Sequence, residues 1–309
     1  MNLALNVLEQ GFLFGIVAIG VYITYKILDF PDLSVDGTYP LGAAICAALL
    51  VKDFSPWIAV LIATMGGAMA GFITAFLNVK LKITNLMSGI LVMIGLYSIN
   101  LMIMGKSNIP LFNAKNIFSN DSSKIFIIIS VLLIIKILFD LFLKTKLGSL
   151  LVAVGDNEQV VTSLGVNKNS IKTLGLMISN GLVALSGALT AQYQGFAEVS
   201  MGTGIVVMGL AAVIIGSSIF KKINFIKATT LSILGSVIYK LAIALVLKFG
   251  LNPNYLKLMT AIIVIIALSL NSKVIKLKKK NKSYSVEEIS DRKGGDLDAK
   301  DSGALQSFQ

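Results

Sequence analysis

Residues 144–172 read KTKLGSLLVAVGDNEQVVTSLGVNKNSIK, a long polar stretch that separates two strongly apolar parts of the chain. This stretch predicts a short helix with Asp156 as its N-cap and Gln159, three positions later, completing a capping-box-like pair. Gly165 is expected to supply the left-handed C′ position that ends the helix. Three apolar residues would share one face, because positions four apart are neighbours on a helix: Val160, Val161 and Leu164. About two turns of helix are not stable alone in water, so we expect a partner surface; an ordinary solvated loop is the alternative.

The composition excludes a soluble globular protein. Apolar residues make up 55% of the 309 residues, charged residues only 14%, and the mean hydropathy is +0.83. The net charge is +11, but the lysines cluster at the ends of apolar segments, as membrane topology requires, and this disfavours binding to nucleic acid. The chain contains no histidine, which excludes a Ser-His protease or an HExxH metalloprotease. We therefore expect a protein that is not an enzyme and that holds no cofactor and no metal.

Nine segments approach the length of about 20 apolar residues that a membrane-spanning helix needs. They are 11–28, 38–51, 54–78, 83–104, 125–143, 173–195, 198–219, 227–247 and 255–270. The predicted fold is an all-α polytopic membrane protein with about nine spanning helices, or eight or ten if one segment is re-entrant. A transmembrane domain 1–275, which contains the 144–172 loop, would be followed by a tail 276–309, basic at first and then disordered. The basic residues of the tail would rest against anionic lipid headgroups.

Orientation follows from the lysines. If the 144–172 loop and the basic run that opens the tail face the cytoplasm, nine spans place the N-terminus outside. The C-terminus is then cytoplasmic.

Two segments predict interrupted helices. Residues 29–42, DFPDLSVDGTYPLG, combine two prolines, two glycines and three aspartates directly before the short apolar run. Non-helical backbone at membrane depth survives only inside protein or beside a water-filled cavity; a surface loop is the alternative. A second glycine-rich break, VSMGTGIVVMG, occupies 199–209. The two elements roughly parallel each other and would cross in opposite directions, which predicts an inverted repeat that marks a translocation pathway.

The loop also resembles a known family. Gly148, Ala153, Gly155-Asp156-Asn157 and Leu164-Gly165-Val166 are similar to the cytoplasmic "EAA" coupling loop of ABC-importer permeases, above all the branched-chain amino acid permease family. The similarity extends from about residue 33 to residue 270. In that family the loop docks into a groove on the ATP-binding subunit. The resemblance therefore implies an ATPase-coupling role for seven residues: Gly155, Asp156, Asn157, Val160, Val161, Leu164 and Gly165.

The resemblance implies partners and a location as well. It predicts a multi-pass protein of the bacterial plasma membrane that pairs with a like or unlike permease and works with an ATP-binding subunit. An external substrate-binding lipoprotein would deliver an amino acid, branched-chain or aromatic; sugars and nucleosides, which neighbouring families carry, stay open. Members of the family carry a Ser-x-x-x-Gly element that is similar to the 29–42 segment and lies near the translocation path.

Polar residues in the spans are candidates for lining that path, although they also serve as packing contacts between helices. The candidates are Ser34, Asp36, Thr38, Asn85, Asn180 and Thr203. Lys136 and Asp140 are expected to form a structural pair. An autonomous secondary transporter or channel is the leading alternative function, and it would need ionisable relays at depth, for which only these two residues, Asp36 and Lys240 are available. A membrane scaffold without transport is a further alternative.

Overall fold

The structure is a computed structural model that describes residues 3–118, 124–220 and 227–248, together with positions 258, 261, 262, 264, 265 and 269. The elements below belong to one compact unit, Met1–Val264, and Ile265–Gln309 form a separate unit. Most of the predicted ninth segment, 255–270, and the whole tail 276–309 lie outside the described residues. The domain boundary at 275 therefore stays a prediction.

The described part of the chain is almost entirely helical. Its elements are α1 (Leu3–Tyr22), the π-helical turn η1 (Ile23–Ile27), α2 (Val35–Leu50), α3 (Pro56–Val79), α4 (Asn85–Met104), β1 (Asn108–Pro110), α5 (Lys124–Leu143), α6 (Lys146–Asp156), α7 (Glu158–Ser163), α8 (Lys168–Gln194), β2 (Phe196–Glu198), the 3-10 turn η3 (Val199–Gly202), α9 (Ile205–Ile219) and α10 (Ala228–Lys248).

Seven helical stretches among the described residues are long and apolar enough to cross a membrane. They are Ala4–Ile27, Pro56–Val79, Asn85–Met104, Lys124–Leu143, Lys168–Gln194, Val199–Ile219 and Ala228–Lys248. Helix α2, with 16 residues, is shorter, as the 38–51 run predicted. The protein is thus a multi-pass helical membrane protein, whereas the predicted count of about nine spans is not confirmed.

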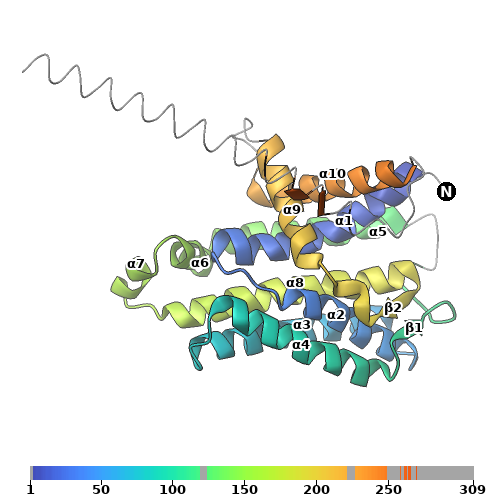
Figure 1. Ribbon diagram of the computed structural model, residues 1–309, viewed down its shortest axis with the longest axis horizontal. Coiled ribbons are helices and arrows are strands. Elements are labelled where there is room, and N and C mark those ends of the chain that lie inside the picture. The colour runs from blue at the N-terminus through green and yellow to red at the C-terminus, as the bar shows by residue number, and fades with distance from the viewer. Residues whose placement is uncertain are drawn as a thin grey trace, which may run out of the picture. The chain divides into compact units, whose positions relative to one another are not determined.

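Helix α8 is the central element of this unit and packs against α1, α2 and α3. Figure 1 shows it lying lengthwise between them, with α6 and α7 at one end and the strands β1 and β2 at the other. A Cβ added to Gly67 of α3 would lie 2.6 Å from the carbonyl oxygen of Asn180, and one added to Gly42 of α2 would lie 2.0 Å from that of Ala184. Small residues thus let backbones approach closely, which is how helices associate in lipid.

Each end of the helical unit is closed by contacts between distant segments. At one end, β1 and β2 form an antiparallel pair that joins the α4–α5 connection to the chain after α8. At the other end, α6 lies against the end of η1: a Cβ added to Gly155 would lie 1.6 Å from the carbonyl oxygen of Ile27. The 144–172 loop therefore packs directly on the first membrane span.

The predicted pair within α5 is confirmed, because Lys136 Nζ lies 2.9 Å from Asp140 Oδ2. The beginning of α10 and the residue before it add two further partners to the same carboxylate: Lys227 Nζ at 3.0 Å and the Thr229 hydroxyl, which donates at 2.8 Å. The group ties α5 to the start of α10 and is structural.

Candidate functional site

A buried polar cluster fixes the place where the chain breaks between η1 and α2. The Asp32 carboxylate accepts hydrogen bonds from the Ser34 hydroxyl at 2.6 Å, the Ser34 backbone N–H at 2.9 Å and the Asn180 amide at 2.8 Å. The Thr38 hydroxyl lies 2.8 Å from Asn180 Oδ1. Because buried polar groups must be paired, this cluster holds the start of α2 against the middle of α8.

Asp36, one turn later, joins the starts of two helices. Its two carboxylate oxygens accept hydrogen bonds from the backbone N–H groups of Gly204 at 2.9 Å and Val206 at 2.8 Å, at the N-terminus of α9. Gly204 has a left-handed φ of 84°, which glycine adopts without a steric penalty. A Cβ at Gly202 would lie 1.9 Å from the carbonyl oxygen of Asp36, so glycine is required there too. The carboxylate accepts hydrogen bonds from N–H groups that would otherwise lack partners. Its negative charge is stabilised by the positive N-terminal end of the α9 dipole.

The two short helices leave Asp36 in different directions: α2 runs along α8, whereas α9 crosses steeply over α1 and α8 (Figure 1). Along α2, Cys46 reaches Gln192 near the end of α8, where β2 follows. Along α9, Gly209 packs on Val21 near the end of α1, on the side of α6 and α7. Both interrupted helices thus begin at about half the depth of the spanning helices. An inverted repeat would produce this arrangement; the repeat itself stays a prediction.

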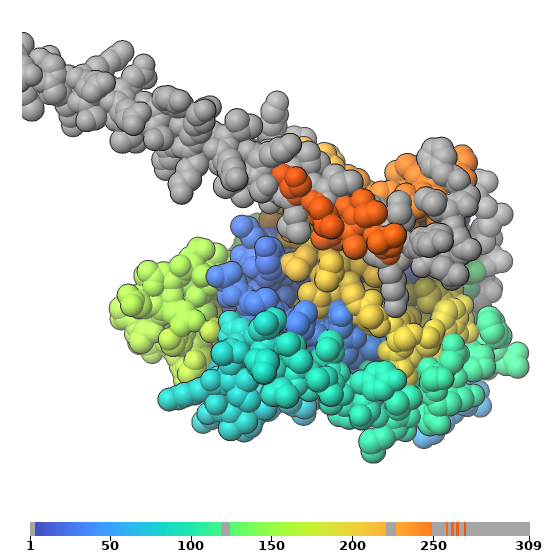
Figure 2. Space-filling model, in the orientation of Figure 1, coloured from blue at the N-terminus to red at the C-terminus, as the bar shows by residue number. Residues whose placement is uncertain are grey.

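A groove of about 440 Å³ lies beside Asp36, between α2, α4 and η3. Its lining is mostly apolar, with a few polar groups: Asp36, Gly37, Pro40, Met93, Ile94, Tyr97, Ser98, Asn100, Val199, Ser200 and Thr203. Figure 2 shows blue α2 atoms exposed between the teal surface of α4 and the gold surface of η3 and α9. The groove is therefore open on this face, and Asp36, which lines it, is partly exposed.

The six predicted pathway residues separate into three groups. Asp36 and Thr203 line the groove. Ser34, Thr38 and Asn180 are fully buried in the Asp32 cluster behind it.

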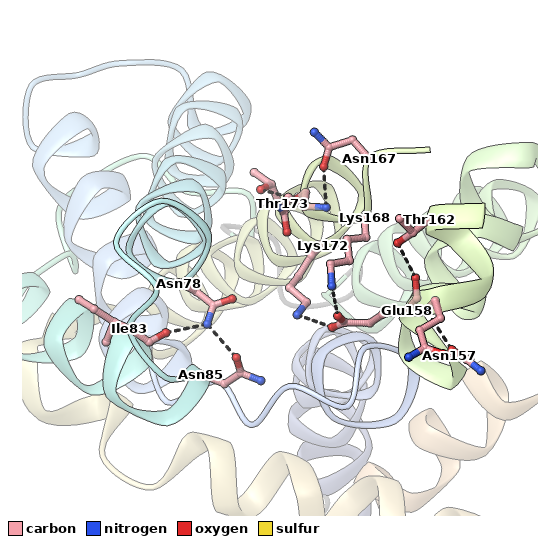
Figure 3. A network of polar contacts seen from close by, with 12 residues as sticks. Asn78, Ile83, Asn85, Asn157, Glu158, Thr162, Asn167, Lys168, Lys172 and Thr173 are labelled. Carbon is pink, nitrogen blue, oxygen red and sulfur yellow. Dashed lines mark hydrogen bonds and ion pairs between the residues drawn. The ribbon is translucent and has the colours of Figure 1, made fainter. Parts of the chain in front are cut away.

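Asn85 lies elsewhere. It is the first residue of α4 and of the candidate span Asn85–Met104, and its Oδ1 accepts a hydrogen bond from Asn78 near the end of α3 (Figure 3). Asn85 is not among the residues that line the groove, and its predicted place in the pathway stays a prediction.

The 144–172 loop forms two helices, α6 and α7, and corrects the predicted cap. Asp156 is the last residue of α6, and Asn157 is the N-cap of α7, with its Oδ1 accepting the Gln159 N–H at 2.9 Å. The predicted C′ glycine is confirmed, because Gly165 has a φ of 73°. Gly155, one of the seven predicted coupling residues, lies within α6 and permits the close contact with η1.

The predicted apolar face of this loop is divided between the interior and the surface. Val161 is 0% exposed and belongs to the main hydrophobic core, whereas Val160 is 49% exposed and Leu164 66% exposed. Val160 and Leu164, four residues apart, therefore form the projecting surface. Val161 anchors α7 to the rest of the chain and is not available to a partner.

Glu158, which the sequence did not single out, holds α7 to the start of α8. Its carboxylate contacts Lys168 Nζ at 2.6 Å and Lys172 Nζ at 2.9 Å (Figure 3). Hydrogen bonds from Lys168 and then Lys172 lower the pKa of Glu158 below its ordinary value. The signal in the sequence is the Lys168–Lys172 spacing, which puts two ammonium groups on one helix face.

Asp32 and Asn100 were also missed as site residues. Asp32 is the centre of the buried cluster. Asn100 is fully buried, lines the groove and donates to the Gly37 carbonyl oxygen at 3.1 Å. A polar residue within an apolar span was the available signal for Asn100.

Comparison with known proteins gives a consistent assignment. Residues 3–269 match the family described as branched-chain amino acid transport system / permease component. A tyrosine transport system permease protein of Clostridioides difficile is 53% identical over 281 residues, 91% of this chain and 95% of that protein. An uncharacterized protein of Rickettsia prowazekii is 36% identical over 278 residues, covering 87% of this chain and 98% of that protein. A galactofuranose transporter permease protein of Escherichia coli is 28% identical over 247 residues, 78% of this chain and 71% of that protein.

The match covers every helix from α1 to α10, including the interrupted helices around Asp36 and the α6–α7 loop. The chain therefore belongs to the family of permease components of branched-chain amino acid transport systems.

Proposed function

We propose that this chain is the transmembrane permease subunit of an ABC importer in a bacterial plasma membrane, and that its substrate is an amino acid. One observation carries the proposal: two interrupted helices, α2 and α9, meet at a carboxylate at half depth beside an open groove. A carboxylate at that depth is strongly disfavoured against lipid. Irregular backbone there needs protein or a water-filled cavity beside it.

The open side of the groove therefore calls for a second permease subunit. Ile94 and Tyr97 on its rim are 59% and 56% exposed, and a partner would cover them and enclose a pathway between two such grooves. A second copy of this chain or a similar permease would serve equally. Alternating access would come from tilting of the two halves.

The α6–α7 loop would receive the ATP-binding subunit. Val160 and Leu164 project from a short helix held firmly from within by Val161 and Glu158. Because α7 is fixed to the rest of the permease in this way, movement of the ATP-binding subunit would be transmitted through α6 to η1 and α8. This end of the unit, and the C-terminus, would then be cytoplasmic.

The opposite end would face the external binding protein. There the β1–β2 pair and a hydrogen bond from the Tyr193 hydroxyl to Glu9 at 2.7 Å join α1 to the chain around the end of α8. This arrangement gives a compact platform.

The amino-acid substrate draws on the relative named for tyrosine transport, which is 53% identical. The relative named for galactofuranose transport, at 28% identity, keeps a sugar as the alternative substrate.

An autonomous transporter is less well supported. Lys136 and Asp140 are paired with each other, and Lys227 and Thr229 complete the group. Asp36 caps α9. The ammonium group of Lys240 lies 5.0 Å from the centre of the Phe14 ring. These ionisable groups are held by structural partners, whereas a relay needs ionisable groups that can bind and release protons or ions.

The test is purification of the tagged protein from its native membrane in mild detergent, with identification of the proteins that accompany it. We expect a stoichiometric subunit with a G-x-x-x-x-G-K-[ST] loop, and ATP-dependent uptake of radiolabelled tyrosine after reconstitution with the binding protein. A homo-oligomer that transports tyrosine without any ATPase would refute the importer assignment.

A further inference from the structure

The groove beside Asp36 has an acceptor-rich floor. The Asp36 carboxylate accepts backbone N–H groups of Gly204, Ile205 and Val206. A carboxylate offers about four acceptor positions, so about one remains for a further donor. This residue is only partly buried and lines the groove, so that position is open to a ligand.

Asn100 supplies a second acceptor. Its amide nitrogen donates to the Gly37 carbonyl oxygen at 3.1 Å, and this assigns the other atom of the amide as oxygen. That oxygen is buried and has no hydrogen-bond partner among the described residues. A buried acceptor without a partner is destabilising, so a donor is expected to come from a water or from a ligand in the groove.

The charge of the groove defines that donor. Asp36 is the one charged side chain among its lining residues. A carboxylate and a neutral oxygen, with no cation beside them, favour a ligand group that is positively charged and donates several hydrogen bonds. An ammonium group has three N–H donors and no acceptor.

The remaining walls define the rest of the ligand. Pro40, Met93, Ile94, Tyr97 and Val199 make the lining chiefly apolar and partly aromatic. Pockets of this kind bind an apolar body and use a few polar groups to orient it. A sugar carries neither a cation nor a large apolar body.

We infer that Asp36 and Asn100 form a binding site for the α-ammonium group of an amino acid with an apolar or aromatic side chain. The inference rests on the proposed function and adds the part of the substrate that this subunit recognises. Asp36 thus acts twice, as the cap of α9 and as the counter-ion of the passing substrate. Substrate binding is thereby linked to the junction of the two interrupted helices.

The test uses the full chain, with the partners that purify with it, in lipid nanodiscs. Saturation-transfer-difference NMR detects millimolar ligands, and the probes are L-tyrosine, tyramine, which lacks the carboxylate, and 3-(4-hydroxyphenyl)propionate, which lacks the ammonium. We expect tyrosine and tyramine to bind and to compete with each other, and the propionate and galactose to give no signal.

Two variants and a matched control locate the site. Asn100→Leu and Asp36→Asn should each weaken tyramine binding about 10-fold or more, the effect of losing a hydrogen bond to a charged group. Asn85→Leu removes the same side chain at the other end of α4 and should leave binding unchanged. If Asp36→Asn fails to fold by size-exclusion chromatography, Asn100→Leu decides.

Four outcomes would overturn the inference: equal binding of the propionate and tyramine, no binding of either amine, wild-type binding by Asn100→Leu, or displacement of the amines by millimolar Na⁺. The proposed function fails separately, if no ATP-binding subunit accompanies the protein. ATP-dependent uptake together with any of the four outcomes would leave the importer assignment standing.

Discussion

Truncation of Leu164 to alanine should weaken binding of the ATP-binding subunit without unfolding the permease. Leu164 is 66% exposed, so about two thirds of its side chain is available to a partner. Complete burial of a leucine side chain stabilises by about 1.5–3 kcal/mol. Leu164→Ala should therefore remove about 1–2 kcal/mol of binding free energy, which is about 5- to 30-fold in the dissociation constant.

The assay is biolayer interferometry between the purified permease in nanodiscs and its ATP-binding subunit. Leu81→Ala is the matched control, because Leu81 is 57% exposed in the α3–α4 turn at the same end of the protein. Val161→Asp is the opposite case. Val161 is 0% exposed in the core, and a buried unpaired carboxylate is costly, so this variant should lose folded protein as well as binding.

The reasoning would be refuted if Leu164→Ala bound the subunit with wild-type affinity while Leu81→Ala did not. The apolar contact would then lie on another loop, and the α6–α7 surface would have no coupling role.

Three further predictions concern the rest of the structure. Asp36→Ala leaves two N–H groups at the start of α9 without their charged acceptor, which costs about 1.5–3 kcal/mol for each hydrogen bond. The melting temperature in detergent should therefore fall by several degrees. An unchanged melting temperature would contradict the role of Asp36 as the cap of α9. Gly42→Val places a Cβ 2.0 Å from the Ala184 carbonyl oxygen and should prevent folding, whereas Gly95→Val on α4, with nothing within 4 Å, should yield normal amounts of monodisperse protein. Because the pKa of Glu158 is lowered, its ion pairs are fully formed above the ordinary glutamate pKa and are lost only as the pH falls through the lowered value. Amide exchange in α7 should therefore accelerate only in strong acid. The Glu158→Gln variant lacks these ion pairs and should show fast exchange in α7 already at neutral pH.

The sequence predicted features that depend on local chemistry. Gly165 ends α7 because a left-handed residue is needed there, and glycine is the residue that adopts it most easily. The short helix was predictable from the prolines and aspartates of 29–42, although the break itself ends at Ser34 and α2, which begins at Val35, includes Pro40.

Features that depend on distant partners were not predictable. Asp156 and Asn157 are both good N-cap residues. Asn157 is the N-cap of α7 because α6 continues through Asp156. The pattern also could not rank Asp32 against Asp36, because their partners, Asn180 and the start of α9, lie more than a hundred residues away. Val161 looked like Val160 in the sequence, and only the packing of α7 separates them.

The contact between Ser34 and Asn180 spans 146 residues, which constrains how the protein is made. At about 5–20 residues per second, α8 leaves the ribosome about 7–30 s after α2. During that interval Asp32 keeps its local donors, the hydroxyl and the backbone N–H of Ser34, but lacks the Asn180 amide. The polar start of α2 therefore gains its buried partner only when α8 has been made. The order of synthesis thus makes α8 the element that completes membrane assembly of the first half of the chain.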